Sequence, residues 1–492
     1  MAASFHMENF GCRAARADGE AMSDRLRAAG LTGQSPSLAD VVVVNTCSVT
    51  AESDRAARAF IRRAHRLNPE ARIVVTGCYA QRAPQELASL SGVAAVVGNS
   101  HKALAPEIIL GLSERTAPHP GSGLIQVQAA TDLERASSEP LAPPQAVWAD
   151  DRFAHSFLEE AQVVPGAQTR PNLKIQEGCG NRCTFCVIPQ TRGSSRSLSA
   201  ASVLKQVEGF VAAGGNELVF SGINLGRWGW DLSGTESREE GTSAPRKLAA
   251  LARQIFERTA LPRLRLSSIE PMDWDGDLIG LMAEFGNPER GQARLARHAH
   301  LPLQSGSDAV LRRMHRRYRP WHYAEKVAAL VRAAGPELTL GADVMVGFPG
   351  ETDAEFEETL ALIHALPFGY LHLFPFSPRP GTPGWTLHAD RPVQAEAVAE
   401  RMAVLRALAL EKTRAHRGSF AGRALEAITL HTPAELDARG RTAALTENFL
   451  PVELEGRLEA NRLVRLRVTG LNAEVTLDAL LEPYEDALPD AH

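Results

Sequence analysis

Three cysteines stand in a C-x3-C-x2-C spacing within the segment Glu177-Gly178-Cys179-Gly180-Asn181-Arg182-Cys183-Thr184-Phe185-Cys186. An apolar run with Leu173 and Ile175 precedes it. Soft thiolates suit iron–sulfur clusters, and three of them hold three irons of a cubane and leave the fourth iron open. A structural zinc site needs four closed ligands, so here it would need a distant residue such as His155 or His298. The spacing therefore favours a cluster with one open corner.

The cysteine motif, with the aromatic Phe185 directly before the last cysteine, resembles that of the radical S-adenosylmethionine (SAM) enzymes. The resemblance implies that the amino and carboxylate groups of SAM chelate the open iron. It also implies that Phe185 packs near the adenine of SAM.

Length and composition set limits on the architecture. A chain of 492 residues, 44% of them hydrophobic, can bury large cores and predicts two or three domains. No apolar run reaches the roughly 18 residues that span a bilayer, and the N-terminus lacks a signal pattern, so we expect a cytoplasmic protein without a membrane partner. The net charge of -5 argues against a general polyanion binder, so any nucleic-acid binding must come from local patches.

Residues 1–112 alternate between predicted strands and helices and indicate a small parallel α/β domain. A strand is expected to end at Phe10-Gly11-Cys12, and further strands are expected to run over residues 41–44, 72–76 and 93–97. Helices are expected from Cys12 to Gly30 and from a cap at Ser53 to Leu67.

Each cysteine of this domain, Cys12, Cys47 and Cys78, falls just after a predicted strand. The carboxyl ends of parallel strands form the ligand crevice of an open sheet, so we expect these three thiolates to converge. The alternative is three unrelated buried thiols. In a chain without a secretion signal, metal binding is favoured over disulfides.

Residues 113–170 resemble a linker, and residues 171–415 contain a second βα series. Six expected strands, near 172–176, 217–221, 264–268, 298–303, 338–346 and 370–375, predict a partial (β/α)6 TIM-like barrel with its working face at the strand carboxyl ends. Residues 233–245 are predicted to form a surface insertion. A helix over 392–416 precedes five short strands in residues 416–485, near 425–430, 442–445, 449–454, 463–468 and 473–477, which predict a small antiparallel β-barrel.

Two cysteine trios in this order, followed by a small barrel, make nearly the whole chain similar to the radical SAM methylthiotransferase family. The matching stretches are 45–50, 76–81, 177–186, 300–308, 346–352 and 374–383. The resemblance implies two 4Fe-4S clusters, one on Cys179, Cys183 and Cys186 that reduces SAM, and one on Cys12, Cys47 and Cys78 that carries the transferred sulfur. One SAM supplies the methyl group and another the radical. The terminal barrel resembles the RNA-binding TRAM domain.

Because the cofactors carry out the reaction at an unreactive C–H bond, no catalytic protein residue is nominated. Further SAM contacts are expected after the barrel strands, with turn formation as the alternative. These are Gly222, Asn224, Glu270, Gln304, Ser305, Val346 and Phe348.

The substrate implied by the resemblance is threonylcarbamoyladenosine in tRNA, because residues 45–50, 222–226 and 265–271 look most like that subfamily. Alternatives are isopentenyladenosine in tRNA, an aspartate of a ribosomal protein, and a redox-sensing iron–sulfur RNA-binding protein without turnover. Implied partners are a reducing electron donor such as flavodoxin or ferredoxin and a sulfur donor.

Two arginine-rich stretches, 55–66 and 312–319, are candidates for contacts with RNA phosphates, although such faces are often simply solvated. The candidate RNA-binding residues are Arg58, Arg62, Arg66, Arg316 and Arg317, with Phe449 of the terminal barrel as a stacking platform. One departure concerns residues 13–20, where relatives commonly carry a motif with Asn and Gln. Polar contacts around the Cys12 cluster are therefore expected to differ.

Overall fold

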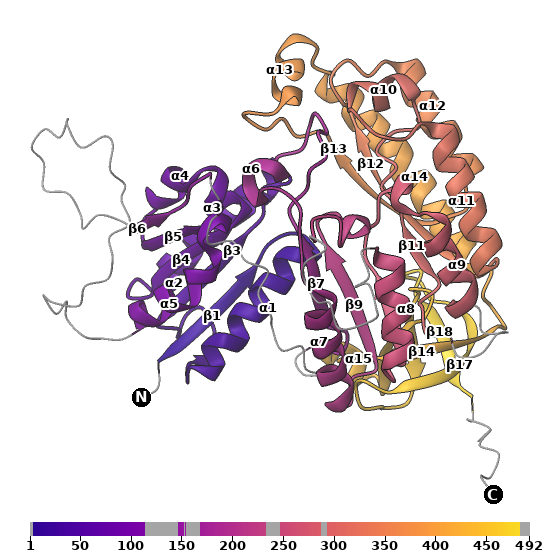
Figure 1. The fold of residues 1–492 in the computed structure, drawn as a ribbon, viewed down its shortest axis with the longest axis horizontal. Coiled ribbons are helices and arrows are strands. Elements are labelled where there is room, and N and C mark those ends of the chain that lie inside the picture. The colour runs from indigo at the N-terminus through magenta and orange to yellow at the C-terminus, as the bar shows by residue number, and fades with distance from the viewer. Residues whose placement is uncertain are drawn as a thin grey trace, which may run out of the picture. The chain divides into compact units, whose positions relative to one another are not determined.

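The computed structural model describes residues 3–113, 146–151, 153, 168–232, 247–286 and 293–482. The chain divides into two compact units, Met1–Phe157 and Leu158–His492 (Figure 1). Most of the predicted linker over 113–170 and the whole predicted insertion over 233–245 lie outside the described residues.

The first unit is built on a six-stranded parallel sheet with the order β2-β1-β3-β4-β5-β6. Its strands are β1 (Ser4–Asn9), β2 (Thr32–Gly33), β3 (Val41–Thr46), β4 (Arg72–Gly77), β5 (Val93–Gly98) and β6 (Ala146–Trp148). Strand β6 lies within the predicted linker. It pairs with β5, so the chain returns to the sheet after the undescribed segment.

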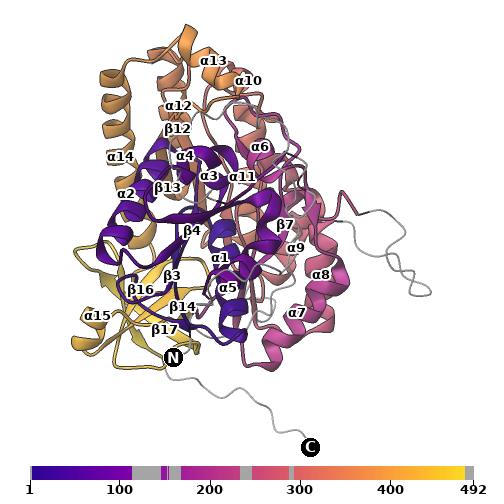
Figure 2. The same ribbon diagram turned by 90° about the vertical axis from the view of Figure 1, so that its left-hand side faces the viewer.

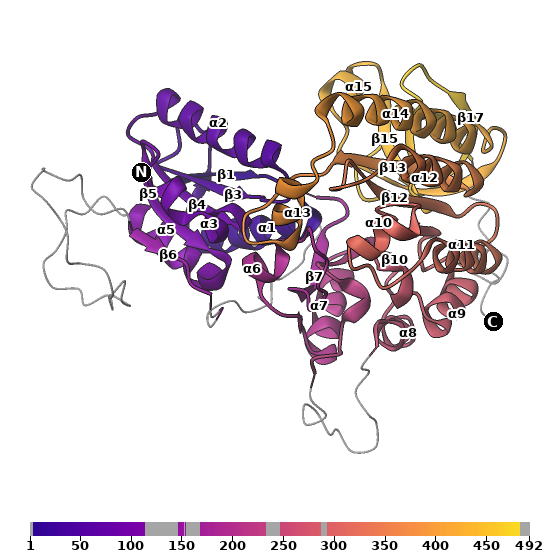
Figure 3. The ribbon, with the colours of Figure 1, turned by 90° about the horizontal axis from the view of Figure 1, so that it is seen from above.

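Helices cover both faces of this sheet (Figure 3). They are α1 (Arg13–Ala28), α2 (Ala51–Leu67), α3 (Cys78–Arg82), α4 (Pro84–Ala88), η1 (Asn99–Leu104) and α5 (Ala105–Ser113). The valines of β3 explain the arrangement, because Val42 and Val44 pack toward α2 while Val41 and Val43 pack toward α1 and α5. The cap of α2 is Thr50, whose hydroxyl accepts from the Ser53 N–H, and not Ser53 as the sequence suggested.

The second unit begins with six parallel strands, at nearly the predicted positions. They are β7 (Asn172–Glu177), β9 (Glu217–Gly222), β10 (Arg263–Leu266), β11 (His298–His300), β12 (Thr339–Val346) and β13 (Phe368–Pro375). Two sheets, β10-β9-β7-β8 and β11-β12-β13, meet through a parallel bridge between Leu264 and Leu295. The short antiparallel strand β8 (Arg196–Ser197) was not predicted.

Helices of the second unit enclose one large core with these strands. They are α6 (Ile188–Arg192), α7 (Ala200–Ala212), η2 (Leu225–Arg227), α8 (Leu248–Arg258), η3 (Pro271–Asp273), α9 (Gly276–Phe285), α10 (Asp308–Arg313), α11 (Pro320–Ala334), α12 (Asp353–Ala365), α13 (Pro383–Asp390) and α14 (Ala395–Gly418). None of the described helices is long and apolar enough to cross a membrane.

The chain ends in a closed five-stranded barrel with the order β14-β15-β16-β18-β17 (Figure 2). Its elements are β14 (Ala424–Thr429), α15 (Ala434–Ala438), β15 (Arg441–Thr446), β16 (Pro451–Glu455), β17 (Leu463–Leu471) and β18 (Leu477–Leu481). All pairs are antiparallel except β16 with β18. The strand predicted over 473–477 is wrong, because Asn472 accepts from the N–H groups of Glu474 and Thr476 and makes that segment a turn.

Ion pairs join this terminal barrel to the central one. The buried Arg297 pairs with Glu447 of the terminal barrel and, at 2.5 Å, with Glu337. Arg263 pairs with Glu426 at 2.9 Å. The predicted domains 171–415 and 416–485 thus belong to one compact unit.

Candidate iron–sulfur and SAM site

The Cys179 loop follows β7 and is shaped by backbone contacts. A Cβ on Gly178, which has a φ of +69°, would lie 2.0 Å from the carbonyl oxygen of Ser194. The Cys179 N–H donates to the Gly193 carbonyl at 3.1 Å, and the Cys186 N–H to the Cys183 carbonyl at 3.1 Å. The loop therefore turns tightly, and only glycine fits at its start.

The fully buried Gln176 holds this loop against the next strand. Its Nε2 donates to the carbonyls of Glu177 and Gly178 at 2.9 and 2.8 Å, and its Oε1 accepts the Asn224 N–H at 2.7 Å. Gln176 was not predicted from the sequence as a site residue. A buried amide at the end of a strand is a weak signal until its partners are known.

Polar donors face the sulfurs of the loop. The Asn181 N–H and the Asn224 amide approach the Cys179 sulfur at 3.4 and 3.5 Å, and Arg316 approaches the Cys183 sulfur at 3.3 Å. Burial raises the pKa of the Cys186 thiol to about 12. A thiolate at this depth needs a positive partner, and iron supplies one.

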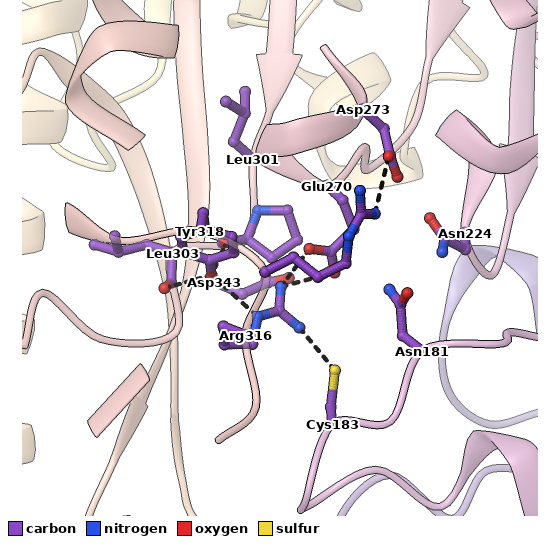
Figure 4. Close-up of polar contacts among 12 residues, drawn as sticks. Asn181, Cys183, Asn224, Glu270, Asp273, Leu301, Leu303, Arg316, Tyr318 and Asp343 are labelled. Atoms are coloured by element: carbon purple, nitrogen blue, oxygen red, sulfur yellow. Dashed lines mark hydrogen bonds and ion pairs between the residues drawn. The ribbon is translucent and has the colours of Figure 1, made fainter. Parts of the chain in front are cut away.

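Arg316 joins this loop to the rest of the barrel. Its guanidinium lies between Cys183 and Glu270, donating to both Glu270 oxygens at 2.7 and 2.6 Å (Figure 4). Its Nε lies 3.2 Å from the Tyr318 hydroxyl, which donates to the carbonyls of Pro302 and Leu303. Arg316 is 7% exposed and paired with Glu270, so its side chain is engaged inside the barrel and does not lie on the surface, where the RNA contact was predicted.

The predicted SAM contacts fall into two groups. Gly222, Asn224 and Glu270 lie near the cysteine loop, and a Cβ on Gly222 would lie 2.9 Å from Gln176 Oε1. Gln304 has a φ of +63°, a strained conformation of the kind often found at functional sites. Phe185 is partly buried against the core.

The side chains of the second group, Ser305, Val346 and Phe348, contact other residues of the central barrel. The Ser305 hydroxyl lies 3.0 Å from that of Thr359 and accepts the Ser307 N–H. Val346 and Phe348 are 1% and 0% exposed, and Phe348 packs edge-to-face on Phe376. These three side chains are therefore engaged in contacts within the central barrel.

In the first unit, the three cysteines follow β1, β3 and β4, which are neighbours in the parallel sheet. A Cβ on Gly11 would lie 2.7 Å from the Cys47 sulfur, so the Cys12 segment lies directly against Cys47. The Asn99 amide approaches the Cys78 sulfur at 3.4 Å. The three cysteine segments therefore lie at the same edge of the sheet, and the convergence of their thiolates stays a prediction.

Among the described residues, the cysteines do not form a ligand group of the size that a single zinc ion needs. Tetrahedral zinc with sulfurs at 2.3 Å would bring the ligand atoms to about 3.8 Å from one another. Among the described residues, one group of His, Cys, Asp and Glu side chains brings its ligand atoms within 4.8 Å of one another. It consists of His300, Asp343 and His372 and contains no cysteine. The cysteines are therefore not arranged as closely as a single zinc ion requires, whereas soft thiolates are the usual ligands of iron–sulfur clusters.

The unusual residues after Cys12 form the start of α1. Ala14, Ala15 and Ala17 are buried, and the Asn45 amide donates to the Ala15 carbonyl at 2.6 Å. The buried Asp18 pairs with Lys102 at 3.0 Å. Small side chains and one ion pair therefore occupy the start of α1, next to Cys12.

A second polar group, missed by the sequence analysis, lies on the sheet β11-β12-β13. Asp343 contacts His300 and His372 at 3.2 Å each, and these contacts outweigh burial and lower the pKa of the Asp343 carboxyl. Tyr370 lies 3.0 Å from His300 and 2.8 Å from His298. The histidines of β11 and β13 could have indicated this polar group from the sequence. The aspartate that joins them lies on β12, and its role depends on the pairing of the strands.

The remaining candidates for RNA contacts differ in their exposure and in their partners. Arg62, Arg66 and Arg317 are exposed, although Arg317 pairs with Asp273 at 3.1 Å. Arg58 bonds to Tyr79 and pairs with Glu86 at 3.0 Å. Phe449 packs on His298 at 4.4 Å, with Arg265 over its ring, so it is partly buried inside the unit.

Comparisons with known proteins agree with this geometry. Residues 4–98 match the Uncharacterized protein family UPF0004, and residues 173–363 match the Radical SAM superfamily. The chain is 32% identical over 463 residues to the threonylcarbamoyladenosine tRNA methylthiotransferase MtaB of Aquifex aeolicus, covering 94% of this chain and 99% of that one.

The chain belongs to the radical SAM methylthiotransferase family.

Another relative within this methylthiotransferase family is the tRNA-2-methylthio-N(6)-dimethylallyladenosine synthase of Parafrankia sp., at 31% identity over 96% of this chain and 84% of that one. The fold is shared with the radical SAM methyltransferase TsrM from Kitasatospora setae, at 16% identity and a TM-score of 0.50, over 78% and 77% of the two chains. As a radical SAM methylthiotransferase, the chain is an enzyme that uses SAM and 4Fe-4S clusters.

Proposed function

We propose that this enzyme adds a methylthio group to C2 of N6-threonylcarbamoyladenosine next to the anticodon of tRNA. The observation that carries the proposal is the similarity to the Aquifex aeolicus enzyme of that name, which extends over 99% of the relative's length. The two cysteine trios and the closed terminal barrel, which fits a TRAM domain, are consistent with it. The domains are proposed as 1–112, 171–415 and 416–485, and of the predicted linker 113–170 the strand β6 belongs to the sheet of the first unit.

In this proposal, the cysteines divide between two clusters. Cys179, Cys183 and Cys186 hold the cluster that binds SAM, and Cys12, Cys47 and Cys78 hold the second cluster. When bound, SAM and the two clusters supply the radical, the methyl group and the sulfur. The protein holds them in place, because cofactor chemistry and not a protein base acts on the C–H bond.

The residues around the Cys179 loop suit the amino-acid end of SAM. An ammonium group needs an anion and a carboxylate needs a cation, and Glu270 and Arg316 offer both at one buried pair. Asn224 lies beside them at the Cys179 sulfur. Phe185 would pack on the adenine, with Gly222, Gln304, Ser305, Val346 and Phe348 around the rest of the ligand.

The partners follow from the proposed chemistry. SAM cleavage needs an electron from a donor such as flavodoxin or ferredoxin, and repeated turnover needs a sulfur donor. A tRNA substrate implies a cytoplasmic enzyme.

The function is tested by comparing modified nucleosides in bulk tRNA from a deletion strain and its parent by mass spectrometry. Loss of methylthio-threonylcarbamoyladenosine with accumulation of its unthiolated precursor is the expected result. Complementation separates the clusters, since Cys47→Ala and Cys183→Ala should each fail to restore the nucleoside. Purified Cys47→Ala should still cleave SAM, while Cys183→Ala should not.

Two other substrates remain alternatives within the same chemistry. The Parafrankia relative favours dimethylallyladenosine, that is, isopentenyladenosine, and loss of its methylthio form would identify that substrate. An unchanged tRNA profile would overturn the tRNA proposal and favour a ribosomal-protein aspartate.

A further inference from the structure

Helix α2 carries a row of arginines that lies on the outer side of the first unit. In Figure 3, α2 lies over the sheet, and its buried residues Ala57, Phe60, Ile61 and Ala64 face the strands. Arg55, Arg62 and Arg66 are exposed on the opposite side. The helix therefore separates into an apolar side and a basic side.

The three exposed arginines have no partners within the part of the chain that the structure describes. No hydrogen bond, ion pair or ring contact joins Arg55, Arg62 or Arg66 to another described residue. The two other arginines of the helix are engaged, because Arg58 pairs with Glu86 and Arg63 lies over the Phe60 ring at 5.2 Å. The nearby acid Asp54 pairs with Arg82 at 2.8 Å, leaving Glu52 in the first turn as an exposed acid.

The register of these residues makes a straight row. Steps of seven and four residues place Arg55, Arg62 and Arg66 within about 40° around the helix axis, and about 16 Å along it. The row starts close to the second cysteine trio, because the helix cap Thr50 is three residues after Cys47. It runs from that site outward along the same unit.

We propose that Arg55, Arg62 and Arg66 bind consecutive backbone phosphates of the tRNA substrate and hold the RNA beside the Cys12, Cys47 and Cys78 site. This inference rests on the proposed function and replaces Arg58 by Arg55 in the contact surface. Guanidinium groups bind phosphates through paired N–H donors, and a row of them follows one strand.

An RNA backbone fits this row better than a protein surface does. Specific protein interfaces have an apolar or aromatic centre. The exposed large apolar residues here lie at the two ends of the helix, Val49 just before it and Leu67 as its last residue, while Ala56 and Ala59 lie between the arginines of the row. Charge without an apolar centre is the pattern of phosphate binding.

The test measures binding of the full-length holoenzyme to bulk tRNA from the deletion strain, over a range of salt concentrations. The variant is the triple Arg55→Gln, Arg62→Gln, Arg66→Gln. The control removes the same charge from three separate exposed helix positions, Arg258→Gln, Arg332→Gln and Arg406→Gln. Cluster content and circular dichroism check the fold of both.

The triple variant should bind tRNA roughly 10-fold more weakly, and its plot of log affinity against log salt should be less steep by about 2 to 3, while the control keeps the wild-type slope. The three Arg→Lys changes should restore most of the affinity. Each single variant should show about a third of the change in this salt-dependence slope. The single variants therefore test the proposal even if the triple variant folds poorly.

A triple variant with wild-type affinity and slope overturns the inference, and so does an equal loss in the control. A loss confined to reduction by flavodoxin, with tRNA binding unchanged, also overturns it and identifies the row as a donor site. Each of these outcomes leaves the nucleoside test of the proposed function unaffected, so the two failures are distinguishable.

Discussion

Gly11 shows how a single position shapes the second cysteine site. It has a φ of +106°, and an added Cβ would lie 2.4 Å from the Cys47 Cβ. Gly30 has a similar φ of +91° but no atom within 4 Å of such a Cβ. The two positions share the backbone strain and differ only in the collision with the cysteine.

We therefore predict that Gly11→Ala displaces Cys47 and prevents assembly of the second cluster, while Gly30→Ala only lowers the free energy of unfolding. The iron content of purified Gly11→Ala should be about half that of the wild type, because one of two four-iron clusters is lost. Gly30→Ala should keep the full iron content and lose about 1 to 3 kcal/mol of stability. Equal iron contents in the two variants would contradict this account.

Among the helices, α14 contacts the central barrel through His416. Its Nε2 lies 2.9 Å from the Thr339 hydroxyl at the start of β12, and its ring lies against Gly369 of β13. Burial, with Arg417 as a smaller cause, lowers the pKa of His416 from 6.5 to about 4. The folded protein therefore holds this ring neutral.

This lowered pKa predicts a loss of stability in acid. The unfolded chain takes up the proton near pH 6.5 and the folded chain only near pH 4, so stability falls as the pH decreases through that window. Between pH 7.5 and 5.5, the free energy of unfolding of His416→Gln should fall by about 1 kcal/mol less than that of the wild type. Urea unfolding at each pH measures this difference. His364→Gln, at an exposed position of α12, should keep the wild-type dependence. If His416→Gln also keeps it, His416 is not the group responsible.

At the scale of the whole molecule, buried charges join the terminal barrel to the central barrel. Arg297 is 8% and Glu447 2% exposed, and the Arg297 N–H also lies 3.3 Å from Glu447. At the base of the central barrel, Arg265 donates to Glu217 at 2.8 Å and to the carbonyl of Thr446 at 3.2 Å. The two barrels of this unit are therefore expected to unfold together.

Glu447→Ala should lower the free energy of unfolding by about 2 to 4 kcal/mol, because it leaves the buried Arg297 with Glu337 alone. Thermal unfolding followed by circular dichroism should still show one transition for the unit, at a lower temperature. The control Glu455→Ala, at an exposed position of the terminal barrel, should change stability by less than about 0.5 kcal/mol. A terminal barrel that melts separately, with the central barrel unchanged, would contradict the coupling.

Much of the fold was determined locally along the chain. Strands buried on both faces need continuous apolar runs, so Val41 to Val44 marked β3, and the six strands of the central barrel appeared at nearly their final positions. The spacing of Cys179, Cys183 and Cys186 indicated the cluster chemistry, because all three ligands lie on one loop. Cys12, Cys47 and Cys78 were predicted to converge because parallel strands end at one edge.

The roles of side chains whose partners are distant in the sequence became clear from the folded chain. Arg316 belongs to a basic stretch that resembles a solvated surface, yet Glu270, 46 residues away, pairs with it in the interior. Phe449 is partly buried because His298 and Arg265 come from the other barrel, and His300 and His372 meet through Asp343. Local patterns specify which backbone segments become helices and strands, whereas burial and charge pairing depend on what folding brings beside each side chain.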